Sequence, residues 1–397
     1  MKKTTIIVLV CSLLPGCVSF PPADKNQATC PLPPEVRILA QKDVNLSEKP
    51  QKITVKRNTV QFTDDGLYVR RCSLTNVINS LDRENKNDRA QIVILYVHGW
   101  KHNATYNDEN LLSFDNLLKQ IWEDELKTVS PRNVVGIYVG WNGKSTDIPV
   151  VKELSFWGRK RAADNISQSA ILTRLIGTID NIISIRKNTN DRAVYLGHSF
   201  GARILYSATS QLLIYNTMRA YPEDQKINRN YKEINSMKGT IVLVNPAFEA
   251  SLFNVFNSLN RRYTEKFDTN QKPLLISISA DNDWATRYAF PVGQLFGLRF
   301  NQEANTTLGN YEKYRTHKLL IDKDYQLGSW KKENKWFDHF CNDEVCLIKD
   351  SKNPSTNGSP FIVASAEASI VNGHNGIWED KFKKWLAKFI SELNKTK

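Results

Sequence analysis

Two kinds of hydrophobic pattern alternate along this chain. Short, continuous apolar runs are separated by longer stretches in which apolar residues recur at helical spacing. The run at 92–97 (Ile-Val-Ile-Leu-Tyr-Val) is typical of a strand that is buried on both faces of a parallel sheet. We predict further strands of this kind over 134–139, 193–196, 240–244, 274–278 and 360–364.

Helical patterns lie between most of these runs, for example over 111–127 and 162–186. From Trp378 to Leu393, aromatic and aliphatic residues recur at helical spacing with lysines between them. A basic amphipathic helix can lie on a membrane, but we favour a final helix that packs its aromatic face onto the sheet. The alternating order predicts an α/β protein with a mostly parallel central sheet flanked by helices.

The first part of the predicted domain shows a different pattern, with polar and apolar residues alternating over 52–70. Asp64-Asp65-Gly66 interrupts this stretch and is typical of a hairpin turn.

The N-terminus has the pattern of a secretory signal. Lys2 and Lys3 precede an apolar run over 6–14, which is too short to span a bilayer as a mature helix. Leu14-Pro15-Gly16-Cys17 resembles a bacterial lipobox, although Pro15 departs from the usual pattern. The resemblance implies that residues 1–16 are a signal peptide, that Cys17 is lipidated, and that the protein is an exported cell-envelope lipoprotein at the outer membrane or facing the periplasm.

Residues 17–50 are rich in proline and polar residues and are interpreted as a tether to the membrane. Residues 51–397 are interpreted as the folded domain. Hydrophobic residues make up 41% of the sequence and charged residues 24%, which is typical of a folded soluble body.

The net charge of +13 is compatible with attraction to anionic lipid headgroups at a membrane surface and equally with a basic surface that has no such partner. Nucleic acid is not an expected partner, because the sequence has no recognition motif that combines aromatic and basic residues. The sequence leaves the oligomeric state open.

Export makes disulfides possible, and four cysteines remain once the signal is removed and Cys17 is used. Four cysteines allow three pairings. Cys341 and Cys346 bracket a short loop that a disulfide could close, and Cys30 would then pair with Cys72; the sequence leaves the pairing open. No nearby cysteine and histidine spacing indicates a zinc site.

The motif with the clearest chemistry is Gly197-His198-Ser199-Phe200-Gly201. It matches G-x-S-x-G and stands between a predicted strand and a predicted helix, where a sharp turn exposes the serine as a nucleophile. The small residues that flank it permit the close packing that such a turn requires. We therefore predict that Ser199 is the nucleophile.

A serine nucleophile needs a base and an acid that orients the base. His374 is the candidate base, because it lies in a glycine-flanked loop after the last predicted strand. Asp281 and Asp283 both follow the strand at 274–278, and Glu249 follows the preceding strand. We favour Asp283 as the acid and keep the other two as alternatives.

The tetrahedral intermediate of acyl transfer needs hydrogen-bond donors for its oxyanion. The backbone N–H of Phe200, directly after the nucleophile, is one candidate. The other is the backbone N–H of Trp100, because His98-Gly99-Trp100 ends an early strand. His98 is interpreted as structural, whereas His102 and Asn103 are expected near the pocket.

These motifs together resemble the α/β-hydrolase superfamily, over about 85–393. The segment 96–104 (Tyr-Val-His-Gly-Trp-Lys-His-Asn-Ala) resembles esterase-like members. The resemblance implies a serine hydrolase without metal or organic cofactor, and it does not define the substrate.

About 90 residues separate Asp283 from His374, and the excess, about 291–359, is interpreted as either a cap over the site or a surface insertion. Trp141, Phe156-Trp157 and Trp284 are candidates for an apolar lining. We expect a membrane-anchored hydrolase of carboxylic esters. The alternatives are a lipase or phospholipase that acts on membrane lipid, and a non-catalytic binding module.

Overall fold

The computed structural model describes most of the predicted domain. The described residues are 36–37, 42–46, 49–85, 89–143, 149–186, 188–221, 233–234, 237–263, 267–268, 271–291, 301–323, 339–350 and 359–393. The predicted signal peptide, Cys17, Cys30 and most of the predicted tether lie outside them.

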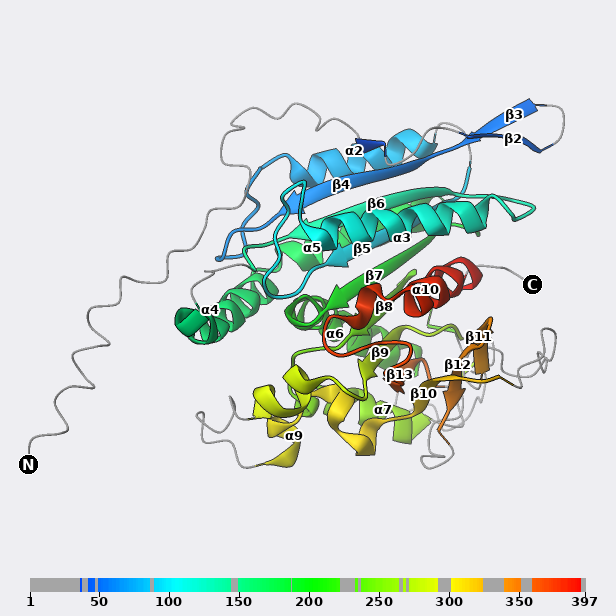
Figure 1. Cartoon of the computed structure of the whole chain (residues 1–397). Helices are drawn as coiled ribbons and strands as arrows, with labels where there is room; N and C mark the ends of the chain where they lie inside the picture. The colour runs from blue at the N-terminus through cyan, green and yellow to red at the C-terminus, as the bar shows by residue number, and fades with distance from the viewer. Residues whose placement is uncertain are drawn as a thin grey trace, which may run out of the picture.

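An 11-stranded sheet forms the centre of the described chain (Figure 1). Its strands, in spatial order, are β1 (Val36–Arg37), β4 (Val55–Gln61), β6 (Asn133–Gly140), β5 (Gln91–Val97), β7 (Arg192–His198), β8 (Gly239–Val244), β9 (Leu275–Ala280), β13 (Phe361–Ala366), β10 (His317–Ile321), β12 (Val345–Lys349) and β11 (His339–Asn342). A separate hairpin pairs β2 (Lys42–Leu46) with β3 (Lys49–Ile53).

The strands from β4 to β10 in this order are all parallel to their neighbours. Only the outer strands pair in the antiparallel direction: β1 with β4, and the hairpin β12–β11 with β10. The six strands predicted from apolar runs are all present, at β5, β6, β7, β8, β9 and β13. The mostly parallel sheet confirms the predicted fold class, and the strand order is that of the α/β-hydrolase fold.

The continuous apolar runs arise because both faces of the sheet are covered. In β5, Val93, Leu95 and Val97 enter the core on one face, whereas Ile92, Ile94 and Tyr96 enter the core on the other. Complete burial of such side chains stabilises the fold by about 1.5–3 kcal/mol each. The sheet is therefore packed between two hydrophobic cores.

The helices cover the two faces unequally. Those described are α2 (Ser73–Asn85), α3 (Glu109–Glu125), α4 (Pro149–Gln168), α5 (Ile171–Ile185), α6 (Phe200–Ala220), α7 (Asn254–Tyr263), α9 (Gln302–Asn305) and α10 (Asp380–Glu392). Helices α3 and α10 lie together on one face (Figure 1). Helices α2, α4, α5, α6 and α7 contribute to the opposite core.

One predicted helix is in fact two. The sequence pattern over 162–186 was continuous, but α4 ends at Gln168 and α5 begins at Ile171. Ala170 between them has a φ of 58°. A left-handed backbone is incompatible with helix continuation, so the chain changes direction there although its apolar spacing persists.

The C-terminal helix packs as predicted. In α10, Phe382, Trp385 and Phe389 are buried in the same core as α3 and the hairpin β11–β12. Trp378, which the pattern placed in the same helix, lies instead in a short 3-10 turn, η5 (Gly376–Trp378). No helix among the described residues combines the length and the hydrophobicity that a membrane span requires.

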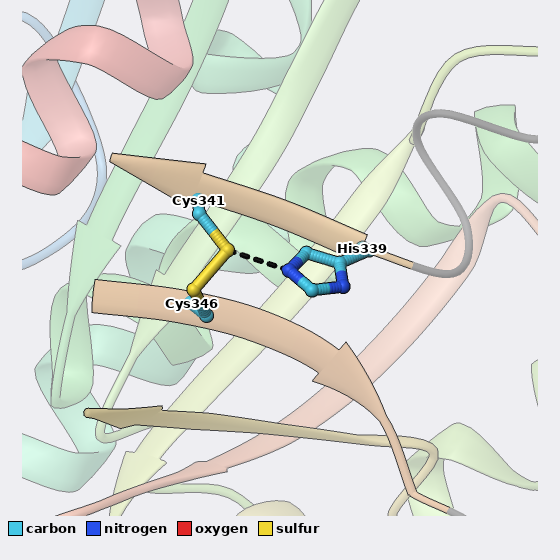
Figure 2. The surroundings of a disulfide bond; sticks show 3 residues. All are labelled: His339, Cys341 and Cys346. Carbon is cyan, nitrogen blue, oxygen red and sulfur yellow. Dashed lines mark hydrogen bonds between the residues drawn. A yellow bond between two sulfur atoms is a disulfide. The ribbon is translucent and has the colours of Figure 1, made fainter. Parts of the chain in front are cut away.

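The disulfide between Cys341 and Cys346 joins β11 to β12 at directly opposed positions (Figure 2). This is the pairing that would close the short loop between the two cysteines. Cys72 is also disulfide-bonded, and its predicted partner Cys30 lies outside the described residues. The described part of 291–359 supplies the last three strands of the sheet edge together with α9 and two 3-10 turns, η3 (Leu308–Asn310) and η4 (Glu312–Tyr314).

The turn predicted at 64–66 is present. The N–H of Gly66 donates to the carbonyl of Thr63, and Phe62 forms an antiparallel bridge with Tyr68. Gly66 has a φ of 77°, a conformation that favours glycine.

Candidate active site

Ser199 occupies a sharp turn between β7 and α6. Its backbone has a φ of 55° and a ψ of −120°, and the residue is buried. A non-glycine residue in this conformation costs about 1–3 kcal/mol and persists only where its surroundings enforce it. The turn therefore presents the hydroxyl at the carboxyl end of the parallel strands, as the strand–turn–helix pattern predicted.

The glycines of the motif allow this turn to pack against β5. A Cβ at Gly201 would collide with the backbone carbonyl oxygens of Val97 and His98. A Cβ at Gly197 would lie 2.8 Å from the Cα of Ala202. The motif thus requires small residues because helix α6 begins in direct contact with two strand ends.

The structure brings together the serine, histidine and aspartate that the sequence singled out. Ser199 Oγ lies 2.7 Å from Nε2 of His374. Nδ1 of the same imidazole lies 2.8 Å from Oδ2 of Asp283. His374 follows β13 and Asp283 follows β9, so the three groups come from the carboxyl ends of three parallel strands.

The ionisation of Asp283 determines which ring nitrogen of His374 carries the proton. Burial alone would raise the pKa of Asp283, but the hydrogen bond and charge of His374 and the N–H of Thr286 outweigh burial and hold that pKa below its ordinary value. An ionised carboxylate only accepts hydrogen bonds. Nδ1 of His374 therefore carries the proton, and Nε2 is left as an acceptor for the hydroxyl of Ser199.

The two alternative acids lie elsewhere. Asp281 is exposed, and no hydrogen bond links its carboxylate to His374 in the described part of the chain. Glu249 is buried and pairs with Lys160 at 3.2 Å and with Arg203 at 2.6 Å. Its carboxylate joins α4 and α6 to the loop after β8 rather than orienting the histidine.

The loop after β5 lies directly beside the nucleophile. A Cβ at Gly99 would lie 2.9 Å from the Cβ of Ser199, so the backbone of this loop is in close contact with the turn. Trp100 follows Gly99, and Phe200 begins α6 directly after the serine. The two backbone N–H groups expected to serve an oxyanion thus belong to the two segments that meet at Ser199.

His98 holds this loop in place, as the structural interpretation predicted. The buried ring donates from Nδ1 to the carbonyl of Gly99 at 2.8 Å and accepts from the N–H of Trp141 at 3.0 Å. Burial is the main cause that lowers the pKa of His98 to about 4, so the imidazole is neutral near pH 7. Trp141 is buried in the core, and its indole N–H donates to the carbonyl of His98 at 2.8 Å.

The other residues expected near the pocket differ in their contacts and in their exposure to solvent. His102 lies 3.4 Å from Asp108, which caps α3, and the carbonyl of Asn103 accepts from Tyr138. Trp284 is 67% exposed. The side chains of Phe156 and Trp157 lie outside the described part of the structure.

Two residues at this site were not singled out as functional from the sequence. His198 donates from Nε2 to the backbone carbonyl of His374 at 2.8 Å, and Asn245 donates to the same oxygen at 2.8 Å. His198 stands at a variable position of the G-x-S-x-G motif, which gives no signal for this role. Asn245 directly follows a predicted strand, and this placement at the carboxyl end of the sheet was the available signal.

One group of possible metal ligands lies at the far edge of the sheet. Ligand atoms of His339, Cys341 and Cys346 lie within 4.8 Å of one another, and Nε2 of His339 is 2.6 Å from the sulfur of Cys341 (Figure 2). The two sulfurs are bonded to each other. Because metal ions bind cysteine as thiolate, this group would need reduction before it could hold one.

No protein-family model matches this chain, and no curated protein does. Among solved structures, a YdeN-like hydrolase from Pectobacterium atrosepticum aligns at 12% identity with a TM-score of 0.23, over 81% of this chain and 99% of that one. The phospholipase PlaB from Legionella pneumophila aligns at 14% identity with a TM-score of 0.26, over 76% of this chain and 62% of that one.

The class of protein is defined by this chain's own strand order and strand ends. It has an α/β-hydrolase fold, with the serine turn after β7, the aspartate after β9 and the histidine after β13.

Proposed function

We propose that this protein is a serine hydrolase that cleaves carboxylic esters through an acyl-enzyme on Ser199. The observation that carries the proposal is the continuous chain of contacts from Ser199 Oγ through His374 to Asp283, at 2.7 Å and 2.8 Å. Both distances lie within the range expected for a nucleophile, its base and the group that orients the base.

The proposed reaction uses these groups in two halves. The hydroxyl of Ser199 attacks the ester carbonyl carbon while its proton moves to Nε2 of His374. The tetrahedral intermediate then breaks the bond to the alcohol, which leaves with that proton. A water molecule deprotonated by His374 attacks the acyl-enzyme, releases the acid and restores Ser199. Asp283 stabilises the protonated imidazole in both halves.

The negative charge on the former carbonyl oxygen needs donors that are already in place. We assign this role to the backbone N–H groups of Phe200 and Trp100, because the segments that carry them meet at Ser199. Each such donor is worth about 10²–10³ in rate. The proposed chemistry needs neither a metal nor an organic cofactor.

A lipid ester is the second candidate substrate. Trp284 and Tyr288 are 67% and 54% exposed, and Trp284 directly follows Asp283. Exposed tryptophan and tyrosine favour the headgroup region of a bilayer. An assay with short-chain and long-chain esters distinguishes the two: preference for soluble short acyl esters contradicts the lipase and phospholipase alternative.

A fluorophosphonate probe tests the hydrolase proposal directly. We expect covalent labelling of the full folded chain and no labelling of Ser199→Ala. Absence of labelling in the folded wild type, or equal labelling of the variant, would favour a non-catalytic binding module that has kept this fold.

The membrane anchor is a separate proposal. We propose lipidation of Cys17 and a location in the bacterial cell envelope, at the outer membrane or facing the periplasm, supported by the lipobox-like sequence at 14–17 and the net charge of +13. Cys17→Ser should move the protein from the membrane fraction to the soluble fraction. An unchanged distribution would contradict the anchor and leave the hydrolase proposal intact.

A further inference from the structure

The backbone carbonyl of His374 accepts hydrogen bonds from two buried side chains. Nε2 of His198 donates to it at 2.8 Å, and Nδ2 of Asn245 donates to it at 2.8 Å. The same Asn245 amide group lies 3.0 Å from the carbonyl of Gly373. His374 is therefore held by hydrogen bonds to its main-chain carbonyl as well as to its imidazole ring.

The two donors come from neighbouring strands. His198 is the last residue of β7 and directly precedes Ser199. Asn245 directly follows β8, which pairs with β7. The loop that carries His374 is thus fastened to the strand end that carries the nucleophile and to the strand beside it.

The environment of His198 determines that its ring proton lies on Nε2. Burial is the main cause that lowers the pKa of His198 to about 3, with the charge of His374 adding to it. The ring is neutral near pH 7 and has a single N–H, which lies on Nε2 because a carbonyl can only accept. Nδ1 has no hydrogen-bond partner among the described residues and lies against Gly99.

The amide of Asn245 is fixed from a third strand. The side-chain Oδ1 of Asn245 accepts the N–H of Ala280 at the end of β9. The backbone N–H of Asn245 donates to the carbonyl of Ile278 in the same strand. Its backbone has a φ of 46°, a conformation that asparagine tolerates better than most residues. With its oxygen occupied by β9, the NH₂ group is directed at the loop of His374.

We propose that His198 and Asn245 are positioning residues, which fix the main chain of His374 so that its imidazole reaches Ser199 and Asp283 at once. The inference rests on the hydrolase proposed above. A displacement of about 1 Å between reacting groups is enough to cost about 100-fold in rate. Since the carbonyl and the ring belong to one residue, losing either donor allows such a displacement.

Matched variants separate this role from general stability. His198→Leu removes one donor, and His198→Gln restores an N–H near the position of Nε2. Asn245→Asp keeps the shape, the positive φ and the oxygen that accepts from Ala280, but it replaces the donor with an acceptor that faces two carbonyls. Asn260→Asp is the control, because buried Asn260 donates to the carbonyl of Phe361 at the opposite end of the sheet.

The first readout is steady-state hydrolysis of a short-chain ester by the full chain, measured beside the melting temperature. We expect His198→Leu and Asn245→Asp to lower kcat by about 10–100-fold with KM changed less than about threefold. His198→Gln should recover most of kcat. Unchanged kcat in both variants, an equal loss in Asn260→Asp, or no recovery in His198→Gln overturns the proposal.

The second readout does not depend on activity. Crystal structures of His198→Leu and Asn245→Asp should show the loop at 373–374 displaced and Nε2 of His374 beyond hydrogen-bond distance of Ser199 Oγ. An undisplaced loop overturns the positioning role even if the wild type is active. A displaced loop in a protein without any esterase activity contradicts the proposed function and leaves the positioning contacts supported.

Discussion

Asp283 and His374 stand 91 residues apart in sequence and share a hydrogen bond of 2.8 Å. The carboxylate is completely buried, whereas the side chain of His374 is 24% exposed. The buried carboxylate is thus held by His374 and by the N–H of Thr286, while the imidazole remains accessible.

Replacing this carboxylate should remove most of the activity. In Asp283→Asn the amide favours the wrong imidazole tautomer, and we expect kcat to fall about 10³–10⁴-fold. Steady-state ester hydrolysis measures the loss. Asp281→Asn is the matched control, and it should stay within about twofold of wild type. Equal losses in the two variants would contradict the assignment of the acid.

Glu249 predicts a specific dependence of stability on pH. Burial alone would raise its pKa, but Arg203 and Lys160 outweigh burial and lower that pKa to about 2. The folded value lies below the unfolded value of about 4.3, so the contribution is complete above about pH 5 and is lost as the pH falls toward 2.

Glu249→Gln should therefore reduce the free energy of unfolding at pH 7 and flatten its decline between about pH 5 and 2. Urea denaturation across this range measures both effects. Glu123→Gln, on a half-exposed residue 4.0 Å from Lys119, should leave the slope unchanged. Parallel wild-type and Glu249→Gln curves would rule out this contribution.

Two helical glycines should respond in opposite ways to the same substitution. Gly201→Ala places a methyl group against the carbonyl oxygens of Val97 and His98, so we expect loss of soluble folded protein. A methyl group at Gly177 in α5 meets nothing within 4 Å. Gly177→Ala should therefore raise the free energy of unfolding by about 0.5–1 kcal/mol. Folded, active Gly201→Ala would contradict the close packing of the serine turn.

The hairpin disulfide should matter for stability and not for catalysis. Removing it with Cys341→Ala and Cys346→Ala together should cost about 2 kcal/mol, because the bond closes only a short loop. The bond lies at the sheet edge, on strands that carry none of the three proposed catalytic groups, so kcat/KM should stay within about twofold. Chemical denaturation and an ester assay on one preparation measure both, and a large loss of kcat/KM would contradict this separation.

The strands and the three catalytic candidates were predictable because each has a local signal. A continuous apolar run marks a strand with two covered faces, and a short chemical motif at a strand end marks Ser199. The break at Ala170 was not predictable from apolar spacing, because the spacing continues through it. The roles of His198 and Asn245 were also hidden, since each acts through a backbone carbonyl more than 100 residues away.

The sheet order also determines when the site can form. Ser199 and His374 are separated by 175 residues, and His374 follows β13, which pairs with β9. Contacts this distant in sequence form late, because closing the intervening chain costs entropy before any contact repays it. An incompletely folded chain that lacks this pairing therefore holds the serine without its base. The proposed hydrolysis needs β13 docked on β9, so activity would report completed folding of this part of the sheet.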